Sequence, residues 1–132
     1  MTEKGMGETG KVLVIDDDST ITGLIETVLK RDGYQVLIAN SGGEGISLAR
    51  ETKPNLILMD ITMPDMDGYE ATKQLKADPT LQAIPVIFLT GKSASEDGGR
   101  AFATGGLTYM RKPFSNQQLR DLVMLAMQSI KV

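Results

Sequence analysis

The 132-residue chain contains no cysteine, no histidine and no tryptophan. Without cysteine it can form neither a disulfide framework nor a thiolate metal site, a composition that fits a reducing compartment. Without histidine it has no imidazole base and cannot pass a phosphoryl group through a histidine of its own. These two absences exclude several common kinds of reactive site.

Long apolar runs and a basic surface are also missing. No stretch approaches the ~18 apolar residues that a membrane span needs, and there is no signal-peptide core. The net charge is −3, whereas a nucleic-acid-binding surface needs clustered Lys and Arg. We therefore expect a cytoplasmic protein that binds neither membrane nor nucleic acid. The length suits one domain with a real core but not two.

The chain alternates strand and helix signals five times. Residues 1–10 are polar and include three glycines, so we expect a flexible N-terminal tail followed by one folded domain over residues 11–132. The predicted strands span residues 11–15, 34–39, 55–60, 85–90 and 107–110. The predicted helices begin at the cap Ser19, at a capping box of Ser41 with Glu44, after Asp67-Gly68, near residue 95, and at a capping box of Ser115 with Gln118. Such alternation predicts an α/β fold with a parallel sheet covered on both faces by helices.

Acidic residues follow two of these strands at the point where each strand ends. Asp16 and Asp17 come after the run Val12 to Ile15, and Asp60 closes the run Leu56 to Met59. Both runs lack polar alternation, which is typical of strands buried on both faces. The carboxyl ends of parallel strands meet at one edge, so we expect the three acids to converge there.

Three converging carboxylates need a positive partner. Each pair repels by roughly 4 kcal/mol at ~4 Å and an effective dielectric near 20. Hard oxygen ligands suit Mg²⁺, so the sequence predicts a magnesium site at this edge. Thr90 after the fourth strand and Lys112 after the fifth add two polar side chains to the same edge.

Five sequence motifs occur in a recognisable order. They are Ile15-Asp16-Asp17, the run Met59 to Pro64 with Met66-Asp67-Gly68, Leu89-Thr90-Gly91, Gly105-Gly106, and the run Tyr109 to Phe114. Together they resemble the receiver domain of two-component response regulators, over nearly the whole chain from Lys11 to Lys131. The resemblance implies a flavodoxin-like (βα)5 three-layer sandwich with a five-stranded parallel sheet of order 2-1-3-4-5. Because the last helix runs nearly to the end of the chain, we expect a stand-alone receiver.

The resemblance also implies how the site works. Asp60 would accept a phosphoryl group from the phosphohistidine of a sensor histidine kinase or a histidine phosphotransfer protein. Asp17 and Asp60 would bind Mg²⁺ directly, Asp16 would reach it through water, and the backbone carbonyl of Thr62 would be a further ligand. The chain would then be a phosphorylation-dependent switch that catalyses only its own phosphorylation and dephosphorylation.

Further residues acquire switch roles from the same resemblance. Lys112 would supply a positive charge to the phosphoryl group or to Asp60, while the Thr90 hydroxyl and the Gly91 N–H would donate to phosphoryl oxygens. Tyr109 would turn inward as Thr90 moves, and Pro113 would follow a cis peptide bond. A downstream effector would dock on the face made by the fourth helix, fifth strand and fifth helix. Whether the chain docks onto an effector or relays the phosphoryl group stays open.

Other interpretations compete with this one. The run Val12 to Thr20 also looks like the signature of haloacid-dehalogenase-type Mg²⁺-dependent phosphatases, with Asp16 as nucleophile and Asp18 as general acid. That family needs an acidic pair after its Lys, which is missing here, and gives no role to the run Asp60 to Pro64. A flavodoxin-like cofactor binder would need a Ser/Thr-rich phosphate loop after the first strand, where three acids stand instead.

Taken singly, the site residues also have ordinary structural explanations. Asp17 or Asp18 could be a helix cap, Thr90 a strand-end threonine, and Lys112 a solvated charge. The pair Gly98-Gly99 predicts that the fourth helix is loosely held, with hydrogen exchange over residues 92–104 faster than in the other helices.

Overall fold

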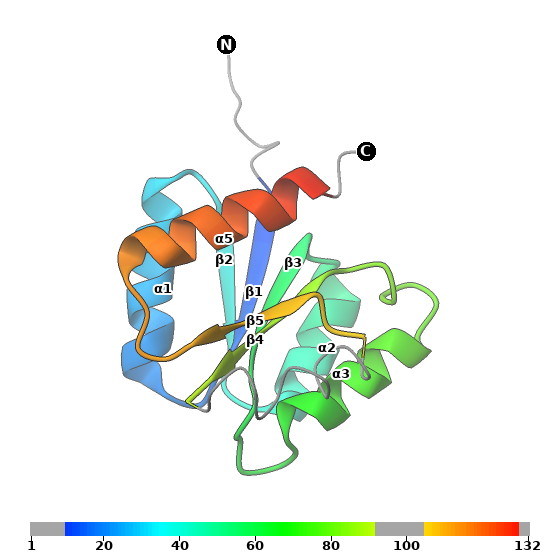
Figure 1. The fold of residues 1–132 in the computed structure, drawn as a ribbon. Helices are drawn as coiled ribbons and strands as arrows, with labels where there is room; N and C mark the ends of the chain where they lie inside the picture. The colour runs from blue at the N-terminus through cyan, green and yellow to red at the C-terminus, as the bar shows by residue number, and fades with distance from the viewer. Residues whose placement is uncertain (1–9, 92–104, 130–132) are drawn as a thin grey trace.

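A computed structural model of the chain describes residues 10–91 and 105–129 (Figure 1). The fourth helix predicted near residues 95–104 lies outside these residues, and so does the predicted fast hydrogen exchange over residues 92–104. The flexible tail predicted for residues 1–10 also lies outside them, apart from Gly10.

One five-stranded parallel sheet forms the centre of the molecule. Its strands are β1 (Lys11–Ile15), β2 (Gln35–Ala39), β3 (Leu56–Asp60), β4 (Val86–Thr90) and β5 (Thr108–Arg111). Their order is β2-β1-β3-β4-β5, which confirms the predicted fold class and strand order. Strand bounds differ from the prediction by one residue in β2, β3, β4 and β5. In β4 the difference removes Pro85, which has no backbone N–H to give to a neighbouring strand.

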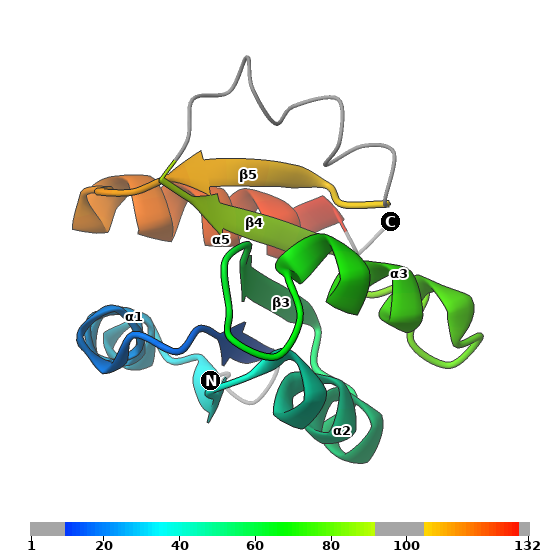
Figure 2. The same ribbon diagram turned by 90° about the horizontal axis from the view of Figure 1, so that it is seen from below.

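Four helices in the described residues cover the sheet: α1 (Ser19–Arg31), α2 (Gly42–Thr52), α3 (Gly68–Ala77) and α5 (Asn116–Ser129). Helices α1 and α5 lie on one face, and α2 and α3 lie on the other (Figures 1 and 2). Alternate side chains of β1 therefore enter different cores. Val12 and Val14 pack with α1 and α5, whereas Leu13 and Ile15 pack with α2 and α3. This burial on both faces of the sheet confirms the prediction made from apolar runs without alternating polar residues.

The helix starts follow side-chain capping, with one correction. Asp18, not Ser19, caps α1: its Oδ1 accepts hydrogen bonds from the N–H groups of Thr20 at 2.9 Å and Ile21 at 3.4 Å. Asp18 has the extended backbone that a cap needs, and Ser19 is the first helical residue. Only Asp16, Asp17 and Asp18 join β1 to α1, so the acids sit on a short connection between two packed elements.

The two capping boxes form differently. At α5, Gln118 N–H donates to Ser115 Oγ at 3.0 Å, and Ser115 N–H donates to Gln118 Oε1 at 2.9 Å, as predicted. At α2, Glu44 N–H donates to Ser41 Oγ at 3.2 Å, but the Glu44 carboxylate accepts from the N–H of Asn40, one residue before the cap.

Candidate functional site at the carboxyl edge of the sheet

Three carboxylates converge where β1 and β3 end, at the edge seen in Figure 2. One oxygen from each of Asp16, Asp17 and Asp60 can be chosen so that all three lie within 4.8 Å of one another. The strands β1 and β3 are neighbours in register, with Ile15 opposite Met59, which brings the acids together. Asp16 is fully buried, Asp60 is 6% exposed and Asp17 is exposed. The predicted convergence is confirmed.

Lys112 provides the positive charge that the two buried acids require. Its Nζ donates to Asp16 Oδ2 at 2.9 Å and to Asp60 Oδ1 at 3.1 Å. The Lys112 backbone N–H donates to the Thr90 carbonyl at 2.6 Å, and its peptide bond to Pro113 is cis, as predicted. The sequence predicted a charge beside Asp60 but gave no sign of the second contact with Asp16.

The site shifts the pKa values of Asp60 and Lys112. Burial raises the pKa of Asp60 to about 6, and the nearby charge of Asp16 adds to the rise, while Lys112 opposes it. For Lys112, burial of the ammonium acts to lower the pKa, but the hydrogen bonds and charges of Asp16 and Asp60 outweigh it and raise the pKa above its usual value. The three side chains thus form one electrostatic unit.

This group of donors fits a hard divalent cation. The ligand atoms available are all carboxylate oxygens, which Mg²⁺ prefers over nitrogen or sulfur. Asp16 already uses both oxygens, because Oδ1 accepts the Asp18 N–H at 3.0 Å and Oδ2 accepts Lys112. Its oxygens are therefore less free than those of the exposed Asp17 to bind an ion directly.

The other predicted residues lie at or near the same edge. Thr90 is buried at the end of β4 and Gly91, next along the chain, is exposed. Tyr109 is half-buried in β5, paired in register with Phe88 of β4. Thr62 is exposed in the loop that follows Asp60. Their roles toward a phosphoryl group stay predictions.

Sequence reasoning missed the role of Asp65. Its Oδ1 accepts the Gly42 N–H at 3.0 Å and its Oδ2 accepts the Gly43 N–H at 2.9 Å, so the loop between β3 and α3 is bonded to the start of α2. The pair Gly42-Gly43, at a helix start where N–H groups lack partners in their own helix, leaves room for such a contact but does not identify Asp65 as the partner.

The phosphatase interpretation requires Asp18 to work beside Asp16 as a general acid. Asp18 instead is exposed, and its carboxylate caps α1. The acid that accompanies Asp16 and Asp17 in the cluster is Asp60, which that interpretation leaves unused. The geometry therefore goes against the phosphatase assignment.

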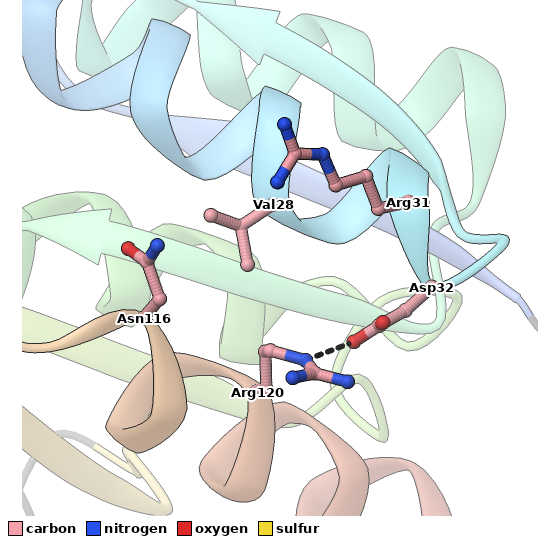
Figure 3. A pocket seen from close by; sticks show the side chains of 5 residues that line it. All are labelled: Val28, Arg31, Asp32, Asn116 and Arg120. Atoms are coloured by element: carbon pink, nitrogen blue, oxygen red, sulfur yellow. Dashed lines mark hydrogen bonds and ion pairs between the residues drawn. The ribbon is translucent and has the colours of Figure 1, made fainter.

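A hollow lies between α1 and α5 (Figure 3). It has a volume of about 210 Å³ and is lined by Val28, Arg31, Asp32, Asn116 and Arg120. Arg120 Nε pairs with Asp32 Oδ2 at 2.9 Å and connects the two helices. This hollow contains none of the three clustered acids.

Among the described residues, no helix has the length and apolar character to cross a membrane.

Comparisons with known proteins agree on one family. A family-wide description of the response regulator receiver domain matches residues 12–124. The chain is 39% identical over 109 residues to Protein PilH of Pseudomonas aeruginosa, covering 83% of this chain and 90% of PilH. It is 38% identical over 109 residues to Protein PilG of the same organism, covering 83% of this chain and 81% of PilG. The solved structure of the Vibrio cholerae chemotaxis protein CheY4 is similar with a TM-score of 0.84 and 28% identity, covering 88% of this chain and 97% of CheY4.

Proposed function

The chain belongs to the response regulator receiver family, a family of phosphoacceptor signalling switches, and on that premise we propose that Asp60 is its phosphoacceptor. The observation that carries the proposal is the position of this carboxylate. Asp60 is 6% exposed, lies beside Asp16 and Asp17, and has the Lys112 ammonium 3.1 Å away. The family gives no support to a haloacid-dehalogenase-type phosphatase.

The proposed reaction is a phosphoryl transfer from a partner's phosphohistidine. An Asp60 carboxylate oxygen attacks the phosphorus, the bond from phosphorus to the imidazole nitrogen breaks, and that nitrogen leaves with the electron pair. The product is an acyl phosphate, which water later hydrolyses at the same site. The chain thus catalyses only its own phosphorylation and dephosphorylation.

Two positive groups, a bound Mg²⁺ and the Lys112 ammonium, would stabilise the negative charge of the phosphoryl group. Asp17, Asp60 and the Thr62 carbonyl would hold Mg²⁺ directly and Asp16 would reach it through water, and the bound ion would supply positive charge for the phosphoryl oxygens. Lys112 bridges two of the acids, and we expect its charge to pair with the added phosphoryl group as well.

The phosphoryl group is proposed to act on a partner through the face of the fourth helix, β5 and α5, of which β5 and α5 belong to the described residues. The Thr90 hydroxyl and the Gly91 N–H donate to the phosphoryl group, and Tyr109 on the adjoining strand turns inward. The large apolar side chains with the greatest exposure among the described residues lie around these elements, at Leu107, Met124 and Leu125. Exposed apolar side chains on these elements are consistent with a protein effector.

Phosphorylation with a small donor tests the acceptor. With Mg²⁺ and acetyl phosphate, intact mass should show one added phosphoryl group, and peptide mapping should place it on Asp60. Asp60→Asn should abolish it. Asp18→Asn is the matched control, because Asn also caps helices well and the variant keeps its fold. Mapping of the phosphoryl group to Asp16, or loss of the modification in Asp18→Asn, would refute the proposal.

Thr90→Ala tests the proposed switch separately from the chemistry. A charge-assisted hydrogen bond from Thr90 supplies about 1.5–3 kcal/mol, whereas moving a two-state equilibrium from 1:99 to 99:1 takes about 5.5 kcal/mol. The variant should therefore still accept a phosphoryl group on Asp60 but respond weakly to it. Hydrogen exchange in β5, compared with and without beryllofluoride and Mg²⁺, should slow clearly in the wild type and little in Thr90→Ala. If hydrogen exchange slows equally in the wild type and in Thr90→Ala, Thr90 has only a structural role.

A further inference from the structure

The loop between β3 and α3, residues 61–67, connects the acceptor strand to the next helix. Its ends are fixed by backbone hydrogen bonds: Ile61 N–H donates to Leu89 O at 3.2 Å, and Gly68 N–H donates to Ile61 O at 2.7 Å. Thr62 lies between these ends and is exposed. The path of the chain from Thr62 to Gly68 therefore depends on what holds the middle of the loop.

Asp65 holds the middle of this loop against α2. Its two carboxylate oxygens accept the N–H groups of Gly42 and Gly43, at 3.0 and 2.9 Å. Those N–H groups belong to the first turn of α2, where helical donors lack partners in their own helix and favour negative charge. The bonds are charge-assisted, and they lower the pKa of the Asp65 carboxyl, with Gly43 contributing most and Gly42 next.

Met66 adds an apolar contact at the same place. A Cβ atom built on Gly42 would lie 2.5 Å from Met66 Cγ, so the absence of a side chain at Gly42 is what lets the loop approach the helix. Glycine is otherwise a poor residue for a helix. The Gly42-Gly43 pair thus makes sense as a docking place for the Asp65-Met66 segment. Figure 2 shows the loop from β3 coming down beside α2.

Helix α2 is itself placed tightly against the acidic edge. A Cβ atom on Gly45 would lie 2.4 Å from Ile15 Cδ1, and Ile15 directly precedes Asp16. The first turn of α2 therefore has a fixed position relative to the end of β1. Because Asp65 is bonded to this first turn, the loop that follows Asp60 is also held in place relative to β1.

We propose that Asp65 is a positioning residue for the phosphoacceptor site. By bonding the loop to α2 it holds the Thr62 carbonyl where a divalent cation can use it, and so sets the cation affinity and the phosphorylation rate at Asp60. This inference rests on the proposed function. It assigns to Asp65 a role in the site although its side chain does not belong to the acidic cluster.

Three variants test the proposal. Asp65→Ala removes both acceptors, Asp65→Asn removes the charge but keeps one acceptor, and Asp78→Ala is the control. Asp78 follows α3 and lies outside the loop, and its carboxylate accepts from the Thr80 N–H and from Arg50 in the last turn of α2, far from the first turn that Asp65 contacts. With no metal, in EDTA, hydrogen exchange of residues 61–67 and of the first turn of α2 should be faster in Asp65→Ala than in the wild type. It should be unchanged there in Asp78→Ala.

Calorimetric titration with Mg²⁺ gives the second measurement. Loss of a residue that orients a metal ligand commonly costs on the order of tenfold in metal affinity. We expect Asp65→Ala to bind Mg²⁺ about tenfold more weakly and Asp65→Asn to fall between it and the wild type. Because Ala and Asn change the charge equally, this order separates the lost hydrogen bonds from the lost charge. The rate of modification by acetyl phosphate should fall in parallel at limiting Mg²⁺ and recover at saturating Mg²⁺.

The outcomes distinguish this inference from the proposed function. If the wild type binds Mg²⁺ and is modified on Asp60 while Asp65→Ala has the same Mg²⁺ affinity, only the inference fails. A lower melting temperature with an unchanged Mg²⁺ affinity has the same meaning, because the contact would then be merely structural. If the wild type is not modified on Asp60 at all, the proposed function fails and the inference with it.

Discussion

At the scale of single residues, the main feature is that the Asp60 carboxylate lies in a buried position that disfavours its negative charge. Asp60 is nearly buried and faces Asp16, and these two effects raise its pKa to about 6 despite Lys112. The folded chain therefore binds a proton at Asp60 more tightly than the unfolded chain does. Stability is lost as the pH rises from about 4 to about 6, by an upper limit of about 3 kcal/mol.

Asp60→Asn should remove this loss of stability. In EDTA at pH 7.5, we expect the variant to be more stable than the wild type by about 1–2 kcal/mol, less than the upper limit because Lys112 loses one charged partner. At pH 4 the wild-type carboxyl is protonated, so the difference should largely disappear. Urea unfolding at the two pH values measures it. A variant that is equally stabilised at both would mean that the charge of Asp60 is not the cause.

Lys112→Ala should have the opposite effect, because Asp16 and Asp60 then lose their positive partner. The expected loss in EDTA is about 2–4 kcal/mol, below the cost of breaking a fully buried pair because the Lys112 side chain is 22% exposed. Saturating Mg²⁺ should raise the melting temperature more in the variant than in the wild type, since the ion replaces the missing charge. Lys73→Ala, at an exposed position of α3, is the control. Equal Mg²⁺ shifts in all three proteins would contradict this reasoning.

At the scale of elements, the close approach of α2 to β1 depends on Gly45. An alanine there would place a Cβ atom 2.4 Å from Ile15 Cδ1 and 2.7 Å from Ile15 Cγ1. Overpacking of this kind costs about 1–3 kcal/mol. Gly45→Ala should therefore destabilise the fold even though Ala is the better helix former.

Gly23→Ala is the matched control for this change. Gly23 lies inside α1 with nothing within 4 Å of its added Cβ, so the same substitution should stabilise by about 0.5–1 kcal/mol. Chemical denaturation of both variants gives the comparison. Two effects of the same sign would show that packing against Ile15 does not decide the outcome at Gly45.

The sequence predicted the elements that periodicity and apolar runs define. The meeting of Asp16, Asp17 and Asp60 follows from burial patterns and from the rule that parallel strands end at one edge, whereas the strand order was implied by the resemblance to receiver domains. Contacts between segments distant in the chain were not predictable in this way. The bond from Lys112 to Asp16 and the docking of Asp65 on α2 depend on three-dimensional positions that no local pattern encodes.

Helix starts show a subtler limit of the sequence. Asp18 and Ser19 are both good capping residues, and both precede the apolar positions of α1 by a suitable distance. The choice depends on the backbone angles of the connection after β1, where Asp18 is extended and Ser19 is already helical. One residue of uncertainty at a helix start is ordinary, but here it decides whether Asp18 is a cap or a candidate catalytic acid.

At the scale of the whole molecule, the ion pair of Arg120 with Asp32 connects α1 to α5 beside the hollow in Figure 3. The two side chains are 47% and 27% exposed, and exposed pairs of this kind contribute little to stability. A double-mutant cycle of Arg120→Ala and Asp32→Ala should give a small coupling energy that weakens as salt is added. A larger coupling that resists salt would mean that the pair is part of a more rigid, desolvated contact.

The sheet divides the interior into two cores, and alternate side chains of β1 belong to different ones. Substitutions at well-separated sites with no shared neighbours add in free energy. A change under α1 and α5 and a change under α2 and α3 should therefore act as independent events. The two sides of such a protein are free to diverge at different rates: one side can be rebuilt to suit a new partner, while the other continues to support the loop and the acids that carry the chemistry.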